Sequence, residues 1–388
     1  EKDPRRVMRA REQLDAFVIE GNATSYTTLQ QSGIEQADIV AAMTDSDDAN
    51  LMICRMAKKV GSPMTIARVR NPEITADDYI FSASEMGVDH IIHPEREAAD
   101  AIVRLLHESS ASYALELENG RIQLLGLFVE RDSQILHKPL AQLSQYYGDP
   151  PMRIVAISRN HRTIIPTGND QLLPGDQVFV VCDPDYAPKF KKHAGKTDVP
   201  INNVMILGGG LVGQFVASAI AHESNVKIFE DRHGQAERIA DNLPRALVIN
   251  GDGTDFDLLE AEGIADMDAL VAVTGDDEKN IITTLLARHL NVPRSIGLVN
   301  KVEYLPITSS IGMDAVVSKQ VLTVNAVQRF IHHRQVESIA SLPGINAQLI
   351  EYVAAKRSKI TRKPLKKLRF PDNAVVGAIL HEDRYVVP

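Results

Sequence analysis

The chain has 388 residues, 44% of them hydrophobic and 24% charged, which is ordinary for a globular protein with a sizeable core. This length predicts more than one domain, and the net charge of −9 argues against general nucleic-acid binding. The two cysteines, Cys54 and Cys182, lie too far apart to suggest a disulfide framework or a zinc site, so a reducing cytoplasm fits best. The chain begins at Glu1 with neither a methionine nor a signal peptide, and we expect it to be a fragment.

The first 111 residues contain blocks that recur at a constant offset of 230 residues. Gly21-Asn-Ala-Thr matches Gly251-Asp-Gly-Thr, and Val40-Ala-Ala-Met-Thr matches Leu270-Val-Ala-Val-Thr. A constant offset over several blocks indicates a duplication. Extended backwards, it pairs Glu1 with Glu230, so we expect the first strand and glycine loop of the first copy to precede residue 1.

Residues 112–198 predict a small α+β domain. Two β-rich runs between Tyr113 and Glu130 surround Asn119-Gly120, which is typical of a two-residue hairpin turn. A short helix is expected from Lys138, strands at 153–157 and 163–165, and a final strand ending at Cys182. Residues 363–368 and 374–388 echo the middle of this domain, which therefore recurs at the end of the chain.

Residues 199–335 begin with a strand–turn–helix pattern. The apolar run Val204–Leu207 predicts a buried parallel strand, and residues 215–221 predict a helix. Between them, Gly208, Gly210 and Gly213 match the dinucleotide-binding pattern G-x-G-x-x-G. Three consecutive glycines, followed by polar residues, argue against a membrane span.

A second strand, Val226–Phe229, ends in an acid at the position that binds ribose hydroxyls. We therefore predict a nucleotide-binding Rossmann unit; the alternative is a Rossmann fold whose site has decayed. The expected pyrophosphate ligands are backbone amides of Gly208, Gly210, Leu211, Val212 and Gly213, at a helix N-terminus. Glu230 is expected to accept from the ribose. Next to Asp231, Arg232 is expected either to meet phosphate or adenine, or to be a solvated surface residue.

The two copies differ at the carboxyl edge of the sheet, where open α/β sheets bind ligands. Thr274 and Gly275 end the fourth strand, and Thr44 and Asp45 correspond to them. An acid at this place would repel a phosphate.

The fifth strand of the first copy carries Arg68 and Arg70, which alternate on one strand face and are suited to terminal phosphates of ATP. The second copy keeps only Lys301. We therefore expect the first site to favour a triphosphate and the second a dinucleotide or diphosphate; arginines at a subunit interface are the alternative.

This arrangement resembles the tandem RCK (regulator of potassium conductance) family, in particular regulators of Trk-type potassium uptake. The resemblance covers essentially the whole chain. It rests on the glycine loop, on Glu1 and Glu230, on the Gly-Asx-x-Thr motifs at Gly21 and Gly251, and on the block from Val271 to Asn280.

The resemblance implies an α/β fold of tandem Rossmann-like, doubly wound parallel sheets, each followed by a small α+β domain. The expected domains are residues 1–111 (incomplete at its start), 112–198, 199–335 and 336–388 (incomplete at its end). It further implies a non-enzymatic protein, NAD(H) and ATP/ADP as ligands, and a homo-oligomeric, probably tetrameric ring in the cytoplasm. That ring would dock at the inner face of the membrane on a potassium channel or transporter of the TrkH/TrkG type.

In the family, the loop after the third strand lies near the adenine. Its residues here are Asp252, Gly253 and Thr254, with Asn22, Ala23 and Thr24 in the matching places of the first copy. An aspartate that caps a turn and a threonine at a helix N-cap are the alternatives.

Three other features are weighed against simpler roles. The acids at 45, 47, 48 and 276–278 are expected to cap helices rather than hold a metal. The pair His332-His333 lacks partners at ligand spacing. The basic run 356–369 is either a surface for an acidic partner or the membrane, or a solvated linker.

The main functional alternative is an NAD(P)-dependent oxidoreductase with a duplicated Rossmann domain. It would need a proton-transfer residue facing the nicotinamide, and the intervening domain offers no such candidate. Potassium-efflux regulators with one Rossmann unit are disfavoured by the duplication.

Overall fold

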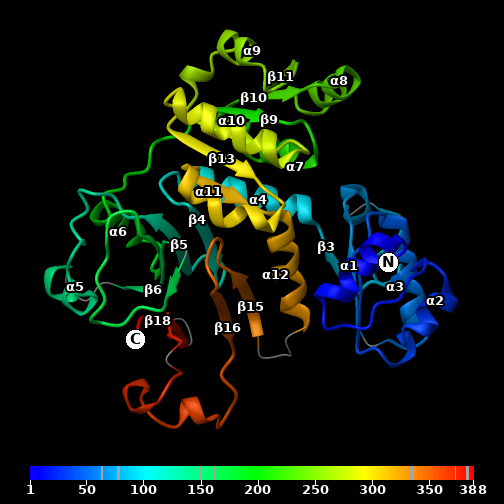
Figure 1. Ribbon diagram of the computed structural model, residues 1–388, viewed down its shortest axis with the longest axis horizontal. Helices are drawn as coiled ribbons and strands as arrows, with labels where there is room; N and C mark the ends of the chain where they lie inside the picture. The colour runs from blue at the N-terminus through cyan, green and yellow to red at the C-terminus, as the bar shows by residue number, and fades with distance from the viewer. Residues whose placement is uncertain are drawn as a thin grey trace. The chain divides into compact units, whose positions relative to one another are not determined.

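The computed structural model describes residues 1–62, 64–76, 79–147, 151–160, 162–331, 336–371, 373–381 and 384–388 (Figure 1). The histidine pair at 332–333 lies outside these residues. The chain divides into two compact units. One comprises Glu1–Glu95 with Thr323–His333, and the other Arg96–Leu322 with Arg334–Pro388.

The second unit contains a six-stranded, fully parallel sheet. Its order is β11-β10-β9-β12-β13-β14, the doubly wound Rossmann order that the sequence predicted. The strands are β9 (Asn203–Leu207), β10 (Asn225–Glu230), β11 (Ala246–Asn250), β12 (Ala269–Ala272), β13 (Arg294–Leu298) and β14 (Ala315–Val317). The helices are α7 (Leu211–Ile220), α8 (His233–Asn242), α9 (Phe256–Ala261), α10 (Asp277–His289) and α11 (Leu305–Ile311), with 3₁₀ turns η3 (Ile264–Asp266) and η4 (Val302–Tyr304).

Alternating side chains of β9 supply the cores on both faces of this sheet. Val204 and Ile206 pack in one apolar cluster, whereas Met205 and Leu207 pack in another with residues of α9 and α10. The first cluster also contains α4 (Pro94–His107), through residues such as Ala98 and Ile102. A helix from the end of the first copy therefore covers the sheet of the second copy, which the sequence did not predict.

A smaller antiparallel sheet lies in the same unit, in the order β4-β5-β8-β6-β7. It consists of β4 (Tyr113–Leu117), β5 (Ile122–Phe128), β6 (Met152–Arg159), β7 (Arg162–Ile164) and β8 (Gln177–Cys182), with α5 (Leu140–Tyr147) and α6 (Ala187–His193). The predicted hairpin is present, but its two-residue turn is wrong. Leu117 pairs with Ile122, which leaves a four-residue loop whose Glu118, Asn119 and Gly120 all have positive φ.

The end of the chain packs on this small sheet. It forms the antiparallel pairs β15 (Val336–Ser341) with β16 (Gln348–Tyr352), and β17 (Ile379–His381) with β18 (Arg384–Val386), and the 3₁₀ turns η5 (Lys359–Thr361) and η6 (Leu365–Lys367). Leu342 shares one buried cluster with Phe179 and Val181 of β8. The two small modules therefore share a core.

The first unit has a three-stranded parallel sheet, β1-β2-β3. Its elements are α1 (Pro4–Gln13), α2 (Tyr26–Gln31), η1 (Ile34–Gln36), β1 (Ile39–Ala42), α3 (Asp47–Lys59), β2 (Met64–Arg68), η2 (Pro72–Thr75) and β3 (His90–Ile92). By the offset of the repeat, these strands correspond to β12, β13 and β14.

One side of this three-stranded sheet is covered by α12 (Lys319–Ile331), a helix from the second copy. Its Ala326 packs with the buried Ile66 and Ile92, and the rings of Phe330 and His90 stack with centroids 3.9 Å apart. Each repeat thus gives its last Rossmann helix to the compact unit of the other. None of the helices in the described part of the chain combines the length and apolar character needed to span a bilayer.

Candidate functional site

The glycine loop lies where the strand order of the six-stranded sheet reverses, between the neighbouring strands β9 and β12. Gly208 has φ +112°, and a Cβ there would lie 2.9 Å from the backbone nitrogen of Thr274. A Cβ on Gly213 would lie 2.0 Å from the carbonyl oxygen of Gly208. Gly210, in contrast, has open space around its missing Cβ. The first and third glycines therefore allow close packing, and the middle one leaves the loop open to an approaching group.

The helix that follows this loop begins without a side-chain cap. Gly210 is its N-cap and contributes no side chain, and α7 starts at Leu211. The first amides of a helix lack intrahelical partners and carry its positive dipole end. The amides of Leu211, Val212 and Gly213 thus occupy the place where a pyrophosphate can be bound.

Glu230 lies beneath the loop and is only 4% exposed. One carboxylate oxygen accepts from the Gly209 amide at 3.2 Å, and the other accepts from the Arg232 amide and Nε at 3.1 and 2.8 Å. Burial acts to raise the pKa of Glu230, but the hydrogen bonds from Arg232 outweigh it and leave the pKa below its usual value. The side chain is therefore an ionised acceptor, as ribose binding requires.

Arg232 fits neither predicted alternative fully. Its side chain is 70% exposed, yet its Nε is paired with Glu230, and Asp231 lies 3.8 Å away. A ribose that binds Glu230 must share the carboxylate with this guanidinium or displace it.

The loop after β11 is built as a turn. Asp252 accepts from the amide and the hydroxyl of Thr254 at 2.9 and 2.8 Å, so its turn-capping role is present. The alternative in which Thr254 caps the next helix is wrong, because the cap of α9 is Asp255. Asn22 and Thr24 repeat the same turn in the first copy. In the second copy, a Cβ on Gly253 would lie 3.1 Å from the side chain of Leu207.

An asparagine that sequence reasoning missed fixes the rim of the crevice. Asn280, fully buried, accepts from the amide and hydroxyl of Thr274 at 2.9 and 2.6 Å. Its amide donates to the carbonyl of Leu298 at 2.8 Å, so it joins the ends of β12 and β13. Asn50 makes the same three bonds with Thr44 and Arg68. The signal was in the sequence: an asparagine recurs six residues after each of these threonines.

The acids after β12 have three different roles. Asp276 caps α10 by accepting from the Lys279 amide, as predicted. For Asp277 the capping prediction is wrong, because its carboxylate accepts from the amides of Asn300 and Lys301 and so holds the loop after β13. Glu278 instead accepts from Nζ of Lys301 at 2.5 Å.

The first copy repeats one of these roles. Asp47 accepts from the amides of Arg70 and Asn71, while Ser46 caps α3, so capping by Asp47 is also wrong. No three His, Cys, Asp or Glu side chains in the described ranges are grouped as metal ligands would be.

In the first unit, the two predicted phosphate-binding arginines meet at Asp45. Arg68 Nη1 lies 3.7 Å from its carboxylate, and Arg70 donates to its carbonyl at 2.7 Å. Arg70 lies beyond the end of β2, so the expected alternation on one strand face is wrong. Glu1 is exposed and accepts from the amides of Lys2 and Asp3.

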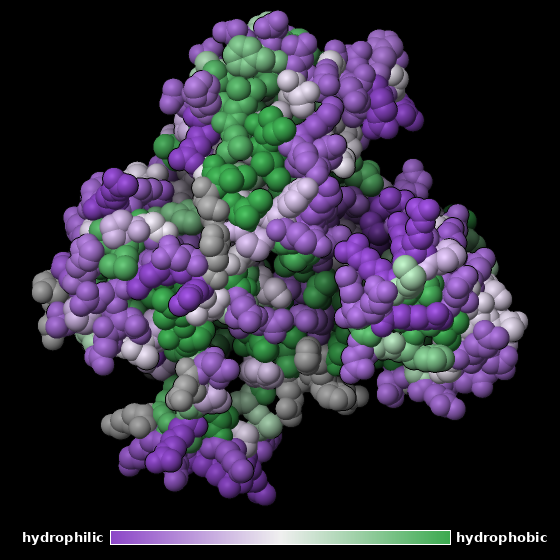
Figure 2. Space-filling view, in the orientation of Figure 1, coloured by the Kyte–Doolittle hydropathy of each residue, from purple (hydrophilic) through white to green (hydrophobic). Residues whose placement is uncertain are grey.

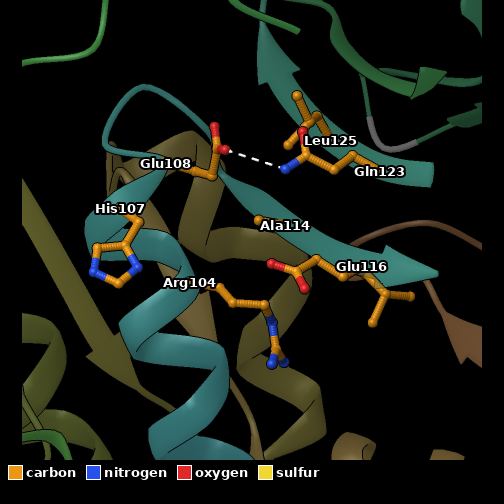
Figure 3. Close-up of a pocket in the computed structure, with 8 residues that line it drawn as sticks. Arg104, His107, Glu108, Ala114, Glu116, Gln123 and Leu125 are labelled. Carbon is orange, nitrogen blue, oxygen red and sulfur yellow. Dashed lines mark hydrogen bonds between the residues drawn. The ribbon is translucent and has the colours of Figure 1, made fainter. Parts of the chain in front are cut away.

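The hollows elsewhere in the second unit do not compete with the crevice. Figure 3 shows a cavity of about 50 Å³ where Arg104 and Glu108 of the α4 end face Glu116 and Gln123 of β4 and β5. It has room for a water molecule or two, not a nucleotide. A shallower hollow of about 320 Å³ lies at the opposite end of β9, beside Ile201 and Val204.

Comparison with known proteins adds family evidence to this geometry. The TrkA-N domain model matches residues 1–94 and 204–319, and the TrkA-C domain model matches residues 125–195. The Trk system potassium uptake protein TrkA homolog 2 of Methanosarcina mazei is 33% identical over 390 residues, covering 98% of this chain and 86% of that protein. The Trk system potassium uptake protein TrkA of Haemophilus influenzae is 29% identical over 381 residues, covering 97% and 83%.

Solved structures agree in fold. The GsuK RCK domain matches 85% of this chain and 70% of its own, with a TM-score of 0.58 and 18% identity. The GsuK channel bound to NAD matches 86% and 59%, with a TM-score of 0.60 and 18% identity.

Proposed function

The chain belongs to the family of Trk system potassium uptake proteins TrkA, and on that premise we propose that it is a nucleotide-sensing regulatory subunit of a potassium-uptake system, not an enzyme. The observation that carries the proposal is the crevice of the second unit. There an open glycine, an uncapped helix start and a buried, ionised Glu230 converge at the reversal of the strand order.

We propose NAD(H) or ADP as the ligand of this crevice, with Asp252, Thr254, Thr274 and Gly275 at its rim. Two structures of similar fold support this choice, since they are described as the GsuK channel bound to NAD and GsuK bound to ADP. In the first unit, Arg68 and Arg70 favour ATP, and Asp45 is partly neutralised by Arg68 instead of simply repelling phosphate.

Control of the pore follows from linkage. Chains of this kind are proposed to form a ring, tetrameric in the simplest case, on a membrane-embedded partner of the TrkH/TrkG type at the cytoplasmic face. A nucleotide then shifts the ring between two shapes only as far as its affinities for them differ.

An oxidoreductase is the weaker candidate. It needs a proton-transfer group within hydrogen-bond reach of the substrate. The polar side chains of Asp252, Thr254, Thr274 and Asn280 are instead used to hold the loops of the crevice together.

Equilibrium titration with NADH, NAD, ADP and ATP tests the proposal. Gly210→Asp places a carboxylate where the pyrophosphate should bind, in space that accommodates the side chain, so it should abolish binding to the second unit without unfolding it. Ser218→Asp adds the same charge at an exposed position two turns along α7 and should bind like the parent chain. The proposal fails if no nucleotide binds, or if both variants bind equally well.

A further inference from the structure

Both halves of the chain expose hydrophobic side chains at equivalent positions. At the offset of the repeat, Phe17 pairs with Leu247, Tyr26 with Phe256, and Met52 with Ile282; their exposed fractions are 85 and 55%, 43 and 41%, and 53 and 64%. Surface positions are the ones freest to diverge towards polar residues after a duplication. Retention of apolar character at three matched exposed positions therefore points to contact with a partner.

In the second unit, the three positions share one face of the sheet. Phe256 and Ile282 belong to α9 and α10, which cover the same side. Leu247 lies two residues before Ile249, which packs in the cluster formed with α9 and α10, so both strand residues point to that side. Figure 2 shows hydrophobic residues gathered over α9 and α10. Val302, Ile307 and Ile311, around α11, are also exposed.

The first unit has the matching face. Tyr26 lies on α2 and Met52 on α3, the counterparts of α9 and α10. Ile80 and Phe81 are 81% and 52% exposed. They precede β3 in the same way that α11 precedes β14.

The charges beside the apolar positions are complementary between two such helices. The exposed residues of α3 follow one helical stripe, namely Asp48, Met52, Arg55 and Lys59. On α10 the stripe contains Glu278, Ile282 and His289, with Arg288 beside it. Each stripe runs from an acid through an apolar residue to a base. Two such helices packed antiparallel bring the apolar residues together and place each acidic end against a basic end.

We infer that these two faces are the surfaces through which copies of this chain assemble, with α3 or α10 of one copy packed antiparallel on α3 or α10 of another. The occupant is a second copy, because the surface is self-complementary and exists twice in each chain. A chain with two such faces can join two neighbours, which is what a closed ring requires. The inference supplies a contact surface for the proposed ring, yet it does not depend on nucleotide binding.

Sedimentation velocity of the purified chain over a range of concentrations tests the surface. Met52→Asp and Ile282→Asp should each raise the dissociation constant of the assembly by roughly 10–100-fold, because each places a charge in a desolvated apolar contact. The double variant should be monomeric. Val353→Asp is the matched control, since Val353 is 52% exposed but lies outside both Rossmann copies; it should assemble normally.

Cross-linking with a short bismaleimide gives an independent result. Cys54 and Cys182 are buried, so Met52→Cys and Ile282→Cys should form chain-to-chain cross-links, whereas Val353→Cys should not. The inference is overturned if the chain is monomeric throughout, or if the assembly survives both aspartates and neither cysteine cross-links. NADH titration of the Met52→Asp variant separates the two ideas: unchanged affinity with lost assembly leaves the nucleotide proposal intact, and normal assembly without nucleotide binding leaves this one intact.

Discussion

Asn280 and Asn50 show how one residue type can shape a crevice without contacting a ligand. Each asparagine satisfies the polar groups at the end of one strand and bonds to the next strand. Because the side chains are completely buried, no water can replace these bonds.

Replacement of Asn280 by alanine should therefore destabilise the second unit by about 2–4 kcal/mol, since it leaves buried backbone groups unpaired. Nucleotide binding to that unit should weaken as well. Denaturant unfolding followed by circular dichroism measures the stability change. Asn242→Ala, at the exposed end of α8, is the control and should cost less than about 0.5 kcal/mol. An equal cost for both variants would contradict the role assigned to Asn280.

Glu230 predicts a specific pH dependence. Its pKa is lower in the folded chain than the usual value, so its contribution to stability is present above the unfolded pKa and is lost as pH falls through the folded pKa. The unfolding free energies of the parent chain and Glu230→Gln should thus differ most near neutral pH and converge below about pH 4. Parallel denaturation series at several pH values measure this, and a constant difference across the series would refute it.

At the scale of elements, the exchange of α4 and α12 determines which segments unfold together. Ala326 is 2% exposed in the core of the first unit, although it comes from the second copy. Ala326→Asp should bury an unpaired charge at a cost of about 3–5 kcal/mol and should loosen β1, β2 and β3.

Hydrogen–deuterium exchange of peptides from residues 39–92 would reveal that loosening. Val324→Asp, on the same helix but 50% exposed, should leave the exchange of those peptides unchanged. If the protection of these strands is the same in both variants, α12 is not a required part of that core.

The elements also show what a single sequence can and cannot predict. The strand–loop–helix around Gly208 followed from its local pattern, because a short apolar run and three spaced glycines allow few backbone conformations. The partners of α4 and α12 did not, because an apolar helix face indicates that it is buried without indicating which sheet covers it. Helix caps were similarly ambiguous: with threonine and aspartate adjacent at 254–255, pattern alone does not determine which of them caps α9.

At the scale of the whole molecule, the two nucleotide sites should respond separately. Asp45 and Arg68 of the first copy are replaced by Gly275 and Leu298 in the second, so an ion pair is exchanged as a pair. The double variant Asp45→Gly with Arg68→Leu should weaken ATP binding roughly 10–100-fold, since a bidentate or close charge contact with phosphate is removed. NADH binding should remain unchanged. Calorimetric titration with both nucleotides measures each affinity, and a parallel loss of both would contradict separate sites.

The crossed helices also bear on the ancestry of the chain. A single-copy ancestor with the same packing could not have covered its sheet with its own last helix, because in this molecule that helix belongs to the core of the other repeat. Such an ancestor would have had to lend the helix to a second polypeptide and borrow one in return. Gene fusion then converted an exchange between partners into an internal one, and it made the two halves inseparable. Expressed apart, each half should remain poorly folded until the other is supplied.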